Sequence, residues 1–412
     1  MNTNAVAGAL SHIRVLDLSR VLAGPWCTQN LADMGAEVIK VERPKVGDDT
    51  RSWGPPWIAS ADGSDSTDST YFASTNRNKK SITIDMAKPG GQALIRELAR
   101  TSDVVIENYK VGDLKRYGLD YAALSEVNPK IVYLSVTGYG QSGPDSHKPG
   151  YDVVFQATGG IMSITGEEDG KPGGGPQKAG IAIADILTGQ YSTIAILAAL
   201  AHRSVTGKGQ YIDMALLDCI VALGSNQVTG FLRSGRIPRR WGNGHPTVVP
   251  YQPFGTADGN VIVAVGNDEQ FRRFCHVLGR EDLAADPKFR RSAGRVANRD
   301  ELLTQIAAVM ATRPGQEWVD KLEANNVPCG RINNYQQVFE EPQVRHRKLR
   351  IDMERSDGGK VATIASPLRL QGTPIQYAKA PPLLGEHTDV VLKDVLGKSD
   401  AEVAALRDGG VV

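Results

Sequence analysis

Strand-like and helix-like patterns alternate along the first half of the chain, and this alternation restricts the fold more than any other feature of the sequence. Branched apolar residues fill 13–18 (IRVLDL), a turn follows at 20–25, a helical pattern spans 26–34, and a second strand pattern fills 37–41 (EVIKV). Two strands that are joined through a helix run parallel, because a parallel connection needs a long crossover. The sequence therefore predicts a βαβ unit that opens a parallel sheet.

The same alternation continues over the following hundred residues. Strand patterns occupy 81–86, 103–107 and 130–136, and a helical pattern follows Pro89. We therefore expect an α/β fold with a doubly wound, Rossmann-like sheet in the first half of the chain.

The second half has a different character, which is typical of a smaller α+β unit. Before this change, which comes at about residue 210, segments rich in Gly, Pro, Ser and Asp predict loops at 54–69 and 166–180. Further elements are predicted as a strand at 211–217, a helix at 216–232, a loop at 236–254, a strand at 260–265, helices at 268–278, 298–311 and 315–324, and short strands with a final helix at 400–407.

Charge and cysteine content narrow the class of function. The chain has 47 basic and 46 acidic residues, a net charge of +1, so nothing favours nucleic acid or a membrane surface as a partner. The cysteines are far apart and form no C-x-x-C pair, which argues against a zinc site and a disulfide framework and fits a reducing cytoplasm. They are Cys27, Cys219, Cys275 and Cys329.

Neither the N-terminus nor the most apolar segment predicts membrane targeting. The opening MNTNAVAGALSHIR lacks the basic region and apolar core of a signal peptide. The apolar window 181–200 is long enough to span a bilayer, but it contains Asp185, and a central Asp costs about 2.5–3.5 kcal/mol to insert. We expect a buried helix there.

The ends of the early strands are where ligands bind in such a sheet. The fingerprint G-x-G-x-x-G is absent, since the first turn (RVLAGPW) offers only Gly24, which disfavours a nicotinamide or flavin site. The helix start after it is either a plain tight turn or an anion site. Arg43, the run 76–80 (NRNKK) and Asn108 are either solvated surface groups or, taken together, ligands for phosphate.

Asp185 follows the Gly-rich segment 166–180 and stands near the start of a helix whose apolar spacing runs from about 186 to 202. An Asp at that place is commonly a helix cap. A helix N-terminus also stabilises a carboxylate anion, which can act as a nucleophile. The sequence leaves both roles open. It contains no G-x-S-x-G, H-E-x-x-H or P-loop motif, so carboxylate chemistry without a metal fits better than a serine hydrolase or a metalloenzyme.

Several ordered motifs resemble the class III coenzyme A transferases, a family that includes formyl-CoA transferase and carnitine CoA-transferase. The resemblance runs from about residue 10 to residue 412 and includes RVLDLSRVLAGPWCTQNLADMGAEVIKVERP, NRNKKSITIDM, DVVIENY, VTGYGQSGP, GKGQYIDMALLD and PPLLGEHTDVVLKDVLG. Within the family, GDDTRSWGPPW, TNRNKKSI, RRWGNGHPTVVPYQPF and INNYQQVFEEPQV look closest to the succinyl-CoA:glutarate (succinate–hydroxymethylglutarate) branch.

The resemblance implies a fold and an assembly. The family has a Rossmann-like large domain and a smaller α+β domain, and two ring-like monomers interlock as a homodimer. We therefore expect residues 1–225 to form the N-terminal part of a CoA-binding large domain and residues 226–333 to form the small domain with its linkers. Residues 334–412 are expected to return to the large domain.

The resemblance also implies the site residues. The family's nucleophilic aspartate falls at Asp185, and its CoA-contacting positions fall at Leu22, Ala23, Arg43, Ile84, Asn108, Arg116 and Lys148. Its flexible glycine loop falls at Gly242, Gly244 and His245, where this chain has GNGH and not a run of glycines. Tyr151 is a further candidate substrate contact. By chemistry alone, the candidates for holding a second carboxylate of the substrate are Arg77, Arg240 and His245.

The implied activity is transfer of CoA from an acyl-CoA, such as succinyl-CoA, to a small carboxylic or dicarboxylic acid such as glutarate. Asp185 would carry a mixed anhydride and then an aspartyl-CoA thioester. Acyl-CoA is then a substrate, and neither a tightly bound cofactor nor a metal is expected. The α-methylacyl-CoA racemases are the first alternative, but their histidine base is replaced in Gly150-Tyr151-Asp152, and a tyrosine with a pKa near 10 is a poor base. A CoA-binding protein without turnover is the second.

Overall fold

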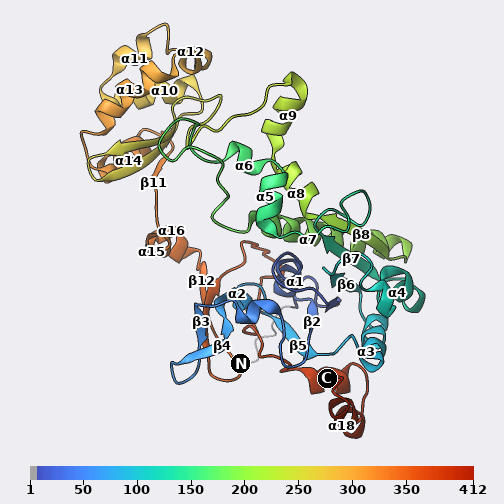
Figure 1. The fold of residues 1–412 in the computed structure, drawn as a ribbon. Helices are drawn as coiled ribbons and strands as arrows, with labels where there is room; N and C mark the ends of the chain where they lie inside the picture. The colour runs from blue at the N-terminus through green and yellow to red at the C-terminus, as the bar shows by residue number, and fades with distance from the viewer. Residues whose placement is uncertain (1–6) are drawn as a thin grey trace. The chain divides into compact units, whose positions relative to one another are not determined.

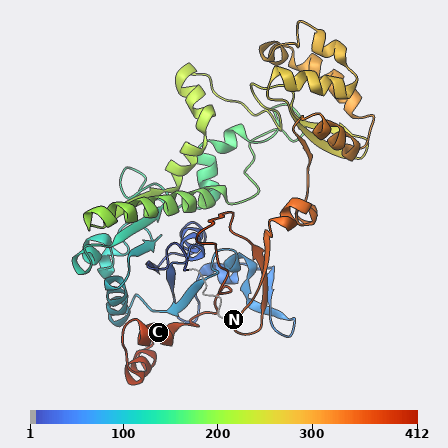
Figure 2. The same cartoon turned by 180° about the vertical axis from the view of Figure 1, so that it is seen from behind.

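The computed structural model describes residues 7–412 and divides into two compact units (Figures 1 and 2). The first unit consists of residues up to 161, residues 179–232 and residues 345–412, and the second of residues 162–178 and 233–344. Compared with the boundaries expected from the sequence, the second unit also takes in 162–178 and extends to 344. The first six residues of the N-terminal segment, where we expect no signal peptide, lie outside the described residues.

A six-stranded, fully parallel sheet forms the centre of the first unit, which confirms the predicted α/β class. Its strands in spatial order are β5 (Lys79–Thr83), β2 (Glu37–Glu42), β1 (Arg14–Asp17), β6 (Val104–Glu107), β7 (Val132–Thr137) and β8 (Gln210–Ala215). Counted along the chain, this order is 3-2-1-4-5-6, so the direction of strand addition reverses between β1 and β6. Ligands of open parallel sheets bind at the carboxyl ends of the strands at such a reversal.

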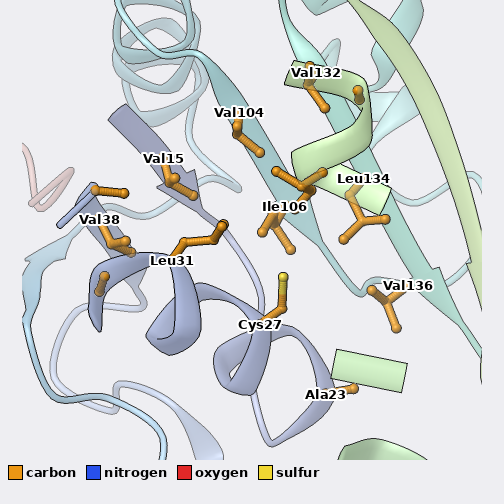
Figure 3. Close-up of a cluster of buried hydrophobic side chains, with 14 of the residues drawn as sticks. Val15, Ala23, Cys27, Leu31, Val38, Val104, Ile106, Val132, Leu134 and Val136 are labelled. Atoms are coloured by element: carbon orange, nitrogen blue, oxygen red, sulfur yellow. The ribbon is translucent and has the colours of Figure 1, made fainter. Parts of the chain in front are cut away.

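Helices cover both faces of this sheet, because its buried strands are apolar on both sides. One face packs against α1 (Ala23–Asp33), α5 (Asp152–Thr158), α7 (Ile183–Thr206) and α8 (Leu216–Leu223). The other packs against α3 (Pro89–Arg100), α4 (Tyr121–Val127), α17 (Thr388–Asp394) and α18 (Asp400–Asp408). Figure 3 shows Cys27 and Leu31 of α1 pointing at Val15 and Ile106 of the sheet.

A small antiparallel sheet lies beside the main one in the same unit. Its strands in order are β12 (Arg350–Glu354), β13 (Lys360–Ile364), β3 (Trp57–Ala59) and β4 (Asp65–Ser69). The predicted loop at 54–69 is therefore wrong in part, because the short apolar strand β3 and the polar strand β4 pair within it. The remaining helical segments of the unit are η1 (Asp49–Ser52), α2 (Thr70–Ala73) and η2 (Lys115–Tyr117), while α6 (Ile161–Ile164) and α9 (Ser225–Ser234) lie at its boundaries.

The second unit is an α+β unit around a three-stranded antiparallel sheet, ordered β11 (Cys329–Arg331), β10 (Gly259–Ala264) and β9 (Tyr251–Thr256). Its helices are α10 (Asp268–Leu278), α11 (Glu281–Ala285), α12 (Ser292–Ala297), α13 (Arg299–Met310), α14 (Gly315–Ala324), α15 (Tyr335–Glu340) and, at its boundary, α16 (Pro342–His346). The bounds of α10 and α14 are those predicted. The predicted loop at 236–254 is wrong at its end, where β9 begins.

Two other sequence predictions fail in instructive ways. The single helix expected at 216–232 is broken between α8 and α9, where Ser225 has a positive φ of 42°. The long helix α7 passes a test for membrane spanning by length and composition, with 39% of the tested window buried. It packs on α1 and the sheet with one side only, because Tyr191, Ile194 and Val205 are exposed in the single chain. The expectation of a buried helix is therefore met only on the side of α7 that packs on α1 and the sheet.

The C-terminal segment, red in Figures 1 and 2, is tied to the edge strand β5 and its neighbours by buried polar contacts. Arg77 is 4% exposed and binds both carboxylate oxygens of Asp33, at 2.9 and 2.5 Å, while its third nitrogen donates to the carbonyl of Ile364 at 2.9 Å. His387 donates its backbone N–H to the Ser81 carbonyl at 2.8 Å. These contacts join residues about 300 positions apart to one sheet edge.

The Arg77→Ala variant is expected to lose about 3 kcal/mol of unfolding free energy, because it leaves the buried Asp33 carboxylate without its cation. Denaturant unfolding followed by circular dichroism measures this loss. The matched control is Arg407→Ala, which removes an exposed ion pair with Asp389 and should cost less than about 1 kcal/mol. Equal stability of the two variants would show that Arg77 does not hold the returning segment.

Candidate active site

Two adjoining cavities lie at the carboxyl ends of the central strands, where the strand order reverses. The Asp185 cavity has a volume of about 260 Å³ and is lined by the first turn, by the segment after β6, by residues 146–151 and by Asp185. The Arg43 cavity has a volume of about 290 Å³ and lies beside β2 and the segment after β5. Arg20 and Tyr109 line both, so the two cavities form one continuous site in the first unit.

Asp185 is the third residue of α7 and does not cap that helix. The residue before the helix is Ala182, and no side chain caps it from that position. Instead Oδ2 of Asp152, at the start of α5, accepts the N–H of Ala184 at 2.7 Å and that of Asp185 at 3.2 Å. Asp152 therefore satisfies the helix start, and this frees the carboxylate of Asp185 to face the cavity.

The sequence predicted that the helix N-terminus stabilises the anion of Asp185, but the surroundings of this carboxyl group favour its neutral form. Burial raises the pKa of this carboxyl to about 7, and the neighbouring Asp152 carboxylate contributes to the same rise. A helix N-terminus stabilises an anion, but here desolvation and the second negative charge outweigh that effect. Such a carboxyl changes its charge near neutral pH, which is typical of a reacting group.

The turn between β1 and α1 forms one wall of the Asp185 cavity. Val21 adopts a positive φ of 69°, which is rare for a β-branched residue. Both side-chain atoms of Asn108 bind the backbone of Arg20, the oxygen accepting its N–H at 3.0 Å and the nitrogen donating to its carbonyl at 2.7 Å. The Asp48 carboxylate accepts the N–H of Val21 at 3.2 Å. Side chains from neighbouring strands and turns thus hold the backbone that faces Asp185.

Nine of the residues predicted for the site line these two cavities. Leu22, Ala23, Asn108, Lys148, Tyr151 and Asp185 line the Asp185 cavity, and Arg43, Ile84 and Arg116 line the Arg43 cavity. The other four do not line either cavity: Arg77 lies under the returning segment with its guanidinium held by Asp33, and Gly242, Gly244 and His245 belong to the second unit. Tyr151 is 69% exposed, so it is not a buried packing residue in the single chain.

Three cationic side chains of the site form ion pairs at the protein surface. Arg43 and Arg116 lie 3.7 Å from Asp49 and Asp113, and Lys148 lies 2.6 Å from Asp145. All three cations have more than half of their side-chain surface exposed, so these pairs contribute little to stability. An anionic ligand with several phosphates can therefore replace the carboxylate partners at small cost.

Sequence reasoning missed three groups that shape the site. Asp152 stands in the Gly150-Tyr151-Asp152 motif, but its role depends on a contact with residues more than thirty positions away. Asp48 lies in a polar segment of the sequence and belongs to no motif that would single it out. Tyr71 lies near enough that burial and then the Asp185, Asp152 and Asp48 carboxylates raise its pKa to about 12. No periodic pattern marks any of the three.

The predicted glycine loop is fixed within the second unit. Gly242 has a positive φ of 56° and donates its N–H to Gly166 at 3.1 Å. The positive φ favours glycine at this position, and a Cβ there would lie 2.8 Å from the Glu167 carboxylate, which would have to move. The guanidinium of Arg240 binds Asp169 and the carbonyl of Ser163. His245 donates its N–H to Tyr251 at 3.1 Å.

Comparison with known proteins identifies relatives that match nearly the full length of the chain. A succinate–glutarate CoA-transferase of Agrobacterium fabrum is 49% identical over 386 residues, which are 94% of this chain and 95% of that protein. A succinyl-CoA:glutarate CoA-transferase of Homo sapiens is 43% identical over 403 residues, 98% of this chain and 90% of that one. The crystal structure of a CaiB/BaiF family protein from Brucella suis superposes with a TM-score of 0.84 at 43% identity, covering 94% of this chain and 100% of the other.

The model of one family, CoA-transferase family III, matches residues 10–388, which is most of the chain. The match of the family model and the names of the full-length relatives indicate the same family, and the observed α/β fold is consistent with it. The chain therefore belongs to CoA-transferase family III and is a transferase enzyme.

Proposed function

We propose that this enzyme transfers CoA from succinyl-CoA to a small dicarboxylic acid such as glutarate, with Asp185 as the covalent carrier. The observation that supports this most is the Asp185 carboxylate itself. It lines a cavity at the sheet reversal. Within residues 7–412, no side chain forms a hydrogen bond or an ion pair with it. The names of the two similar transferases supply the donor and the acceptor.

The proposed reaction exchanges one activated acyl bond for another. The Asp185 carboxylate attacks the donor thioester, the C–S bond breaks, and a mixed anhydride and CoA thiolate form. The thiolate then attacks the Asp185 carbonyl of the anhydride, which releases the donor acid and leaves an aspartyl-CoA thioester. The acceptor carboxylate attacks this thioester, and the released thiolate attacks the acyl carbonyl of the second anhydride, which frees Asp185. No ATP, oxidant or metal enters the balance.

The two cavities suit the two ends of an acyl-CoA. Arg43 and Arg116 are placed to bind phosphates in the Arg43 cavity, with Ile84 beside the base. Leu22, Ala23, Asn108 and Lys148 would surround the pantetheine arm on its way to Asp185. In this proposal CoA enters and leaves as substrate, and no cofactor stays bound.

Recognition of the acceptor's second carboxylate stays a prediction. Arg77 is not proposed for this role, since Asp33 and the Ile364 carbonyl engage its guanidinium. Arg240 is engaged in a similar way by Asp169 and the Ser163 carbonyl, so His245 of the second unit is the candidate that remains on chemical grounds. The racemase alternative is not favoured, because Tyr151 replaces the histidine base.

We further propose that the first unit is a Rossmann-like CoA-binding unit and that two chains interlock as a homodimer in the cytoplasm. The 3-2-1-4-5-6 strand order supports the first part. The exposed apolar side of α7, with Tyr191, Ile194 and Val205, supports the second, because apolar side chains in such numbers are commonly covered by a partner.

The Asp185→Ala variant is expected to lose transfer from succinyl-CoA to glutarate by at least about 10⁴-fold, because no other group can form the covalent carrier. Acyl-CoA binding, measured by calorimetry, should persist, since the phosphate contacts are untouched. Asp394→Ala, at the exposed end of α17, is the matched control and should keep full activity. Near-normal turnover in Asp185→Ala would refute the proposed carrier.

The pH profile follows from the raised pKa of Asp185. The nucleophile is the carboxylate, so kcat/KM for acyl-CoA should fall as pH drops through about 7, tenfold for each further unit. Asp152→Asn removes one neighbouring negative charge while keeping an oxygen acceptor for the helix start. It should therefore move the midpoint to lower pH, whereas Asp394→Asn should leave it in place. If the midpoint in Asp152→Asn stays where it is in the wild type, the Asp152 carboxylate does not raise the pKa of Asp185.

Linked rings cannot exchange partners without unfolding. Two differently tagged preparations, mixed and incubated, are therefore expected to form no mixed dimers by native mass spectrometry, whereas mixtures that are unfolded and refolded together should form them. Each species should have twice the chain mass of 44.3 kDa. A monomeric mass, or rapid formation of mixed dimers without denaturant, would rule out the interlocked assembly.

A further inference from the structure

The first turn of the chain contains a strained residue directly beside the proposed carrier. Val21 lies in the left-handed region with a φ of 69°. A β-branched side chain is crowded by its own backbone there, and such conformations cost on the order of 1–3 kcal/mol and persist only where surrounding contacts enforce them. Val21 also lines the Asp185 cavity. The strained backbone therefore lies at the site, and another group must hold it in this conformation.

The Asp48 carboxylate is the group that holds Val21 in this conformation. Both of its oxygens lie 3.2 Å from the Val21 nitrogen, across 27 positions of sequence. Asp48 is 4% exposed and starts the short helix η1, where it accepts the N–H of Thr50 at 3.0 Å and the Thr50 hydroxyl at 2.8 Å. Its position is thus fixed independently of the turn that it holds.

A buried lysine completes the connection. Lys40 is 0% exposed, and its Nζ donates to Asp48 at 2.8 Å and to the carbonyl of Ser19 at 2.9 Å. Burial would raise the pKa of Asp48, but Lys40 and Thr50 lower it below its ordinary value, so the carboxylate stays charged. A single Asp48–Lys40 pair therefore fixes the turn at two places, the Ser19 carbonyl and the Val21 N–H.

The conformation of this turn determines where α1 begins. No side chain caps α1, and its third residue is Pro25, which has no N–H. The uncapped N–H groups at this helix start are therefore those of Leu22, Ala23 and Gly24, and Leu22 and Ala23 line the cavity together with Asp185. At Gly189 a Cβ would lie 2.8 Å from the Ala23 carbonyl, which shows how closely α7 approaches this point.

We propose that Asp48 is a positioning residue for the transfer reaction: by holding Val21 in the left-handed conformation, it aims the free N–H groups at the start of α1 toward the acyl oxygen carried on Asp185. The inference rests on the proposed function. Donors that are fixed before the reaction stabilise the oxyanions of anhydride and thioester formation, and a shift of about 1 Å in such groups costs on the order of 100-fold in rate.

A rescue experiment distinguishes positioning from a purely structural role. Asp48→Asn should lower kcat for succinyl-CoA and glutarate by about ten- to a hundred-fold with a smaller change in KM for acyl-CoA, because the Asp48 carboxylate, although it lines the Arg43 cavity, is engaged by Val21, Lys40 and Thr50 and not by Arg43 or Arg116. Glycine adopts a positive φ without the crowding of valine. In the Val21→Gly background the same Asp48→Asn change should therefore cost less than about threefold, measured against Val21→Gly alone.

The control is Asp33→Asn, which alters an equally buried carboxylate that contacts Arg77 and not the turn. Its effect on kcat should be the same in both Val21 backgrounds. If Asp48→Asn does not fold, Lys40→Met/Asp48→Asn removes both charges of the pair and is compared in the same two backgrounds.

An equal loss of kcat in the two backgrounds, an unchanged kcat, or an effect confined to KM would overturn the role of Asp48. These outcomes leave the carrier role of Asp185 untouched, because that role is decided by Asp185→Ala. Activity in Asp185→Ala would instead refute the proposed function, whatever the Asp48 variants do.

Discussion

The approach of α7 to α1 at Gly189 fixes the position of Asp185. A Cβ on residue 189 would lie 2.8 Å from the Ala23 carbonyl and 2.9 Å from the Trp26 ring, so only glycine permits the two helices to lie this close. One turn earlier on α7, this contact places Asp185 beside the start of α1 and above the strand reversal between β1 and β6. The carboxylate, the uncapped helix start and the two cavities are together because of this contact.

Buried charge gives the site its rigidity. Burial alone would raise the pKa of Asp17 at the end of β1, but Lys79 and Lys40 lower it below its usual range. The same Lys40 binds Asp48, and Asp48 holds Val21. Each of these groups is nearly fully desolvated, so removal of one leaves another without a partner. In contrast, Arg43, Arg116 and Lys148 at the cavities have more than half of their side-chain surface exposed, and they can therefore exchange their carboxylate partners for a ligand.

Periodicity made most of the fold predictable. Strand patterns overlapped all six strands of the parallel sheet, although the pattern at 211–217 was not assigned to that sheet, and the predicted bounds of α10 are those observed. The strands β3 and β4 were missed. DSTDS, which forms β4, carries no apolar alternation, and it pairs with the three-residue strand β3, which in turn pairs with β13 of the returning chain. The break between α8 and α9 was missed because Leu216 to Leu232 keeps helical spacing across Ser225.

The site was predictable where a motif carried it and not where tertiary contact did. Asp185, Arg43 and Asn108 were found from their places after strands and at a helix start. Arg77 was misjudged, because its run of polar neighbours is typical of a surface, whereas Asp33, 44 positions earlier, makes it a buried partner. Asp152 and Asp48 act through backbone N–H groups 27 or more positions away, which no local pattern reveals.

The most direct test of the account is to look for the covalent carrier itself. The enzyme is incubated with succinyl-CoA, quenched with hydroxylamine, digested and analysed by mass spectrometry. An acyl anhydride or thioester on a carboxyl is converted to a hydroxamate, so the account predicts a hydroxamate on Asp185 and none in enzyme incubated without succinyl-CoA. An unmodified Asp185 under turnover, or a modification confined to another residue, would contradict the account.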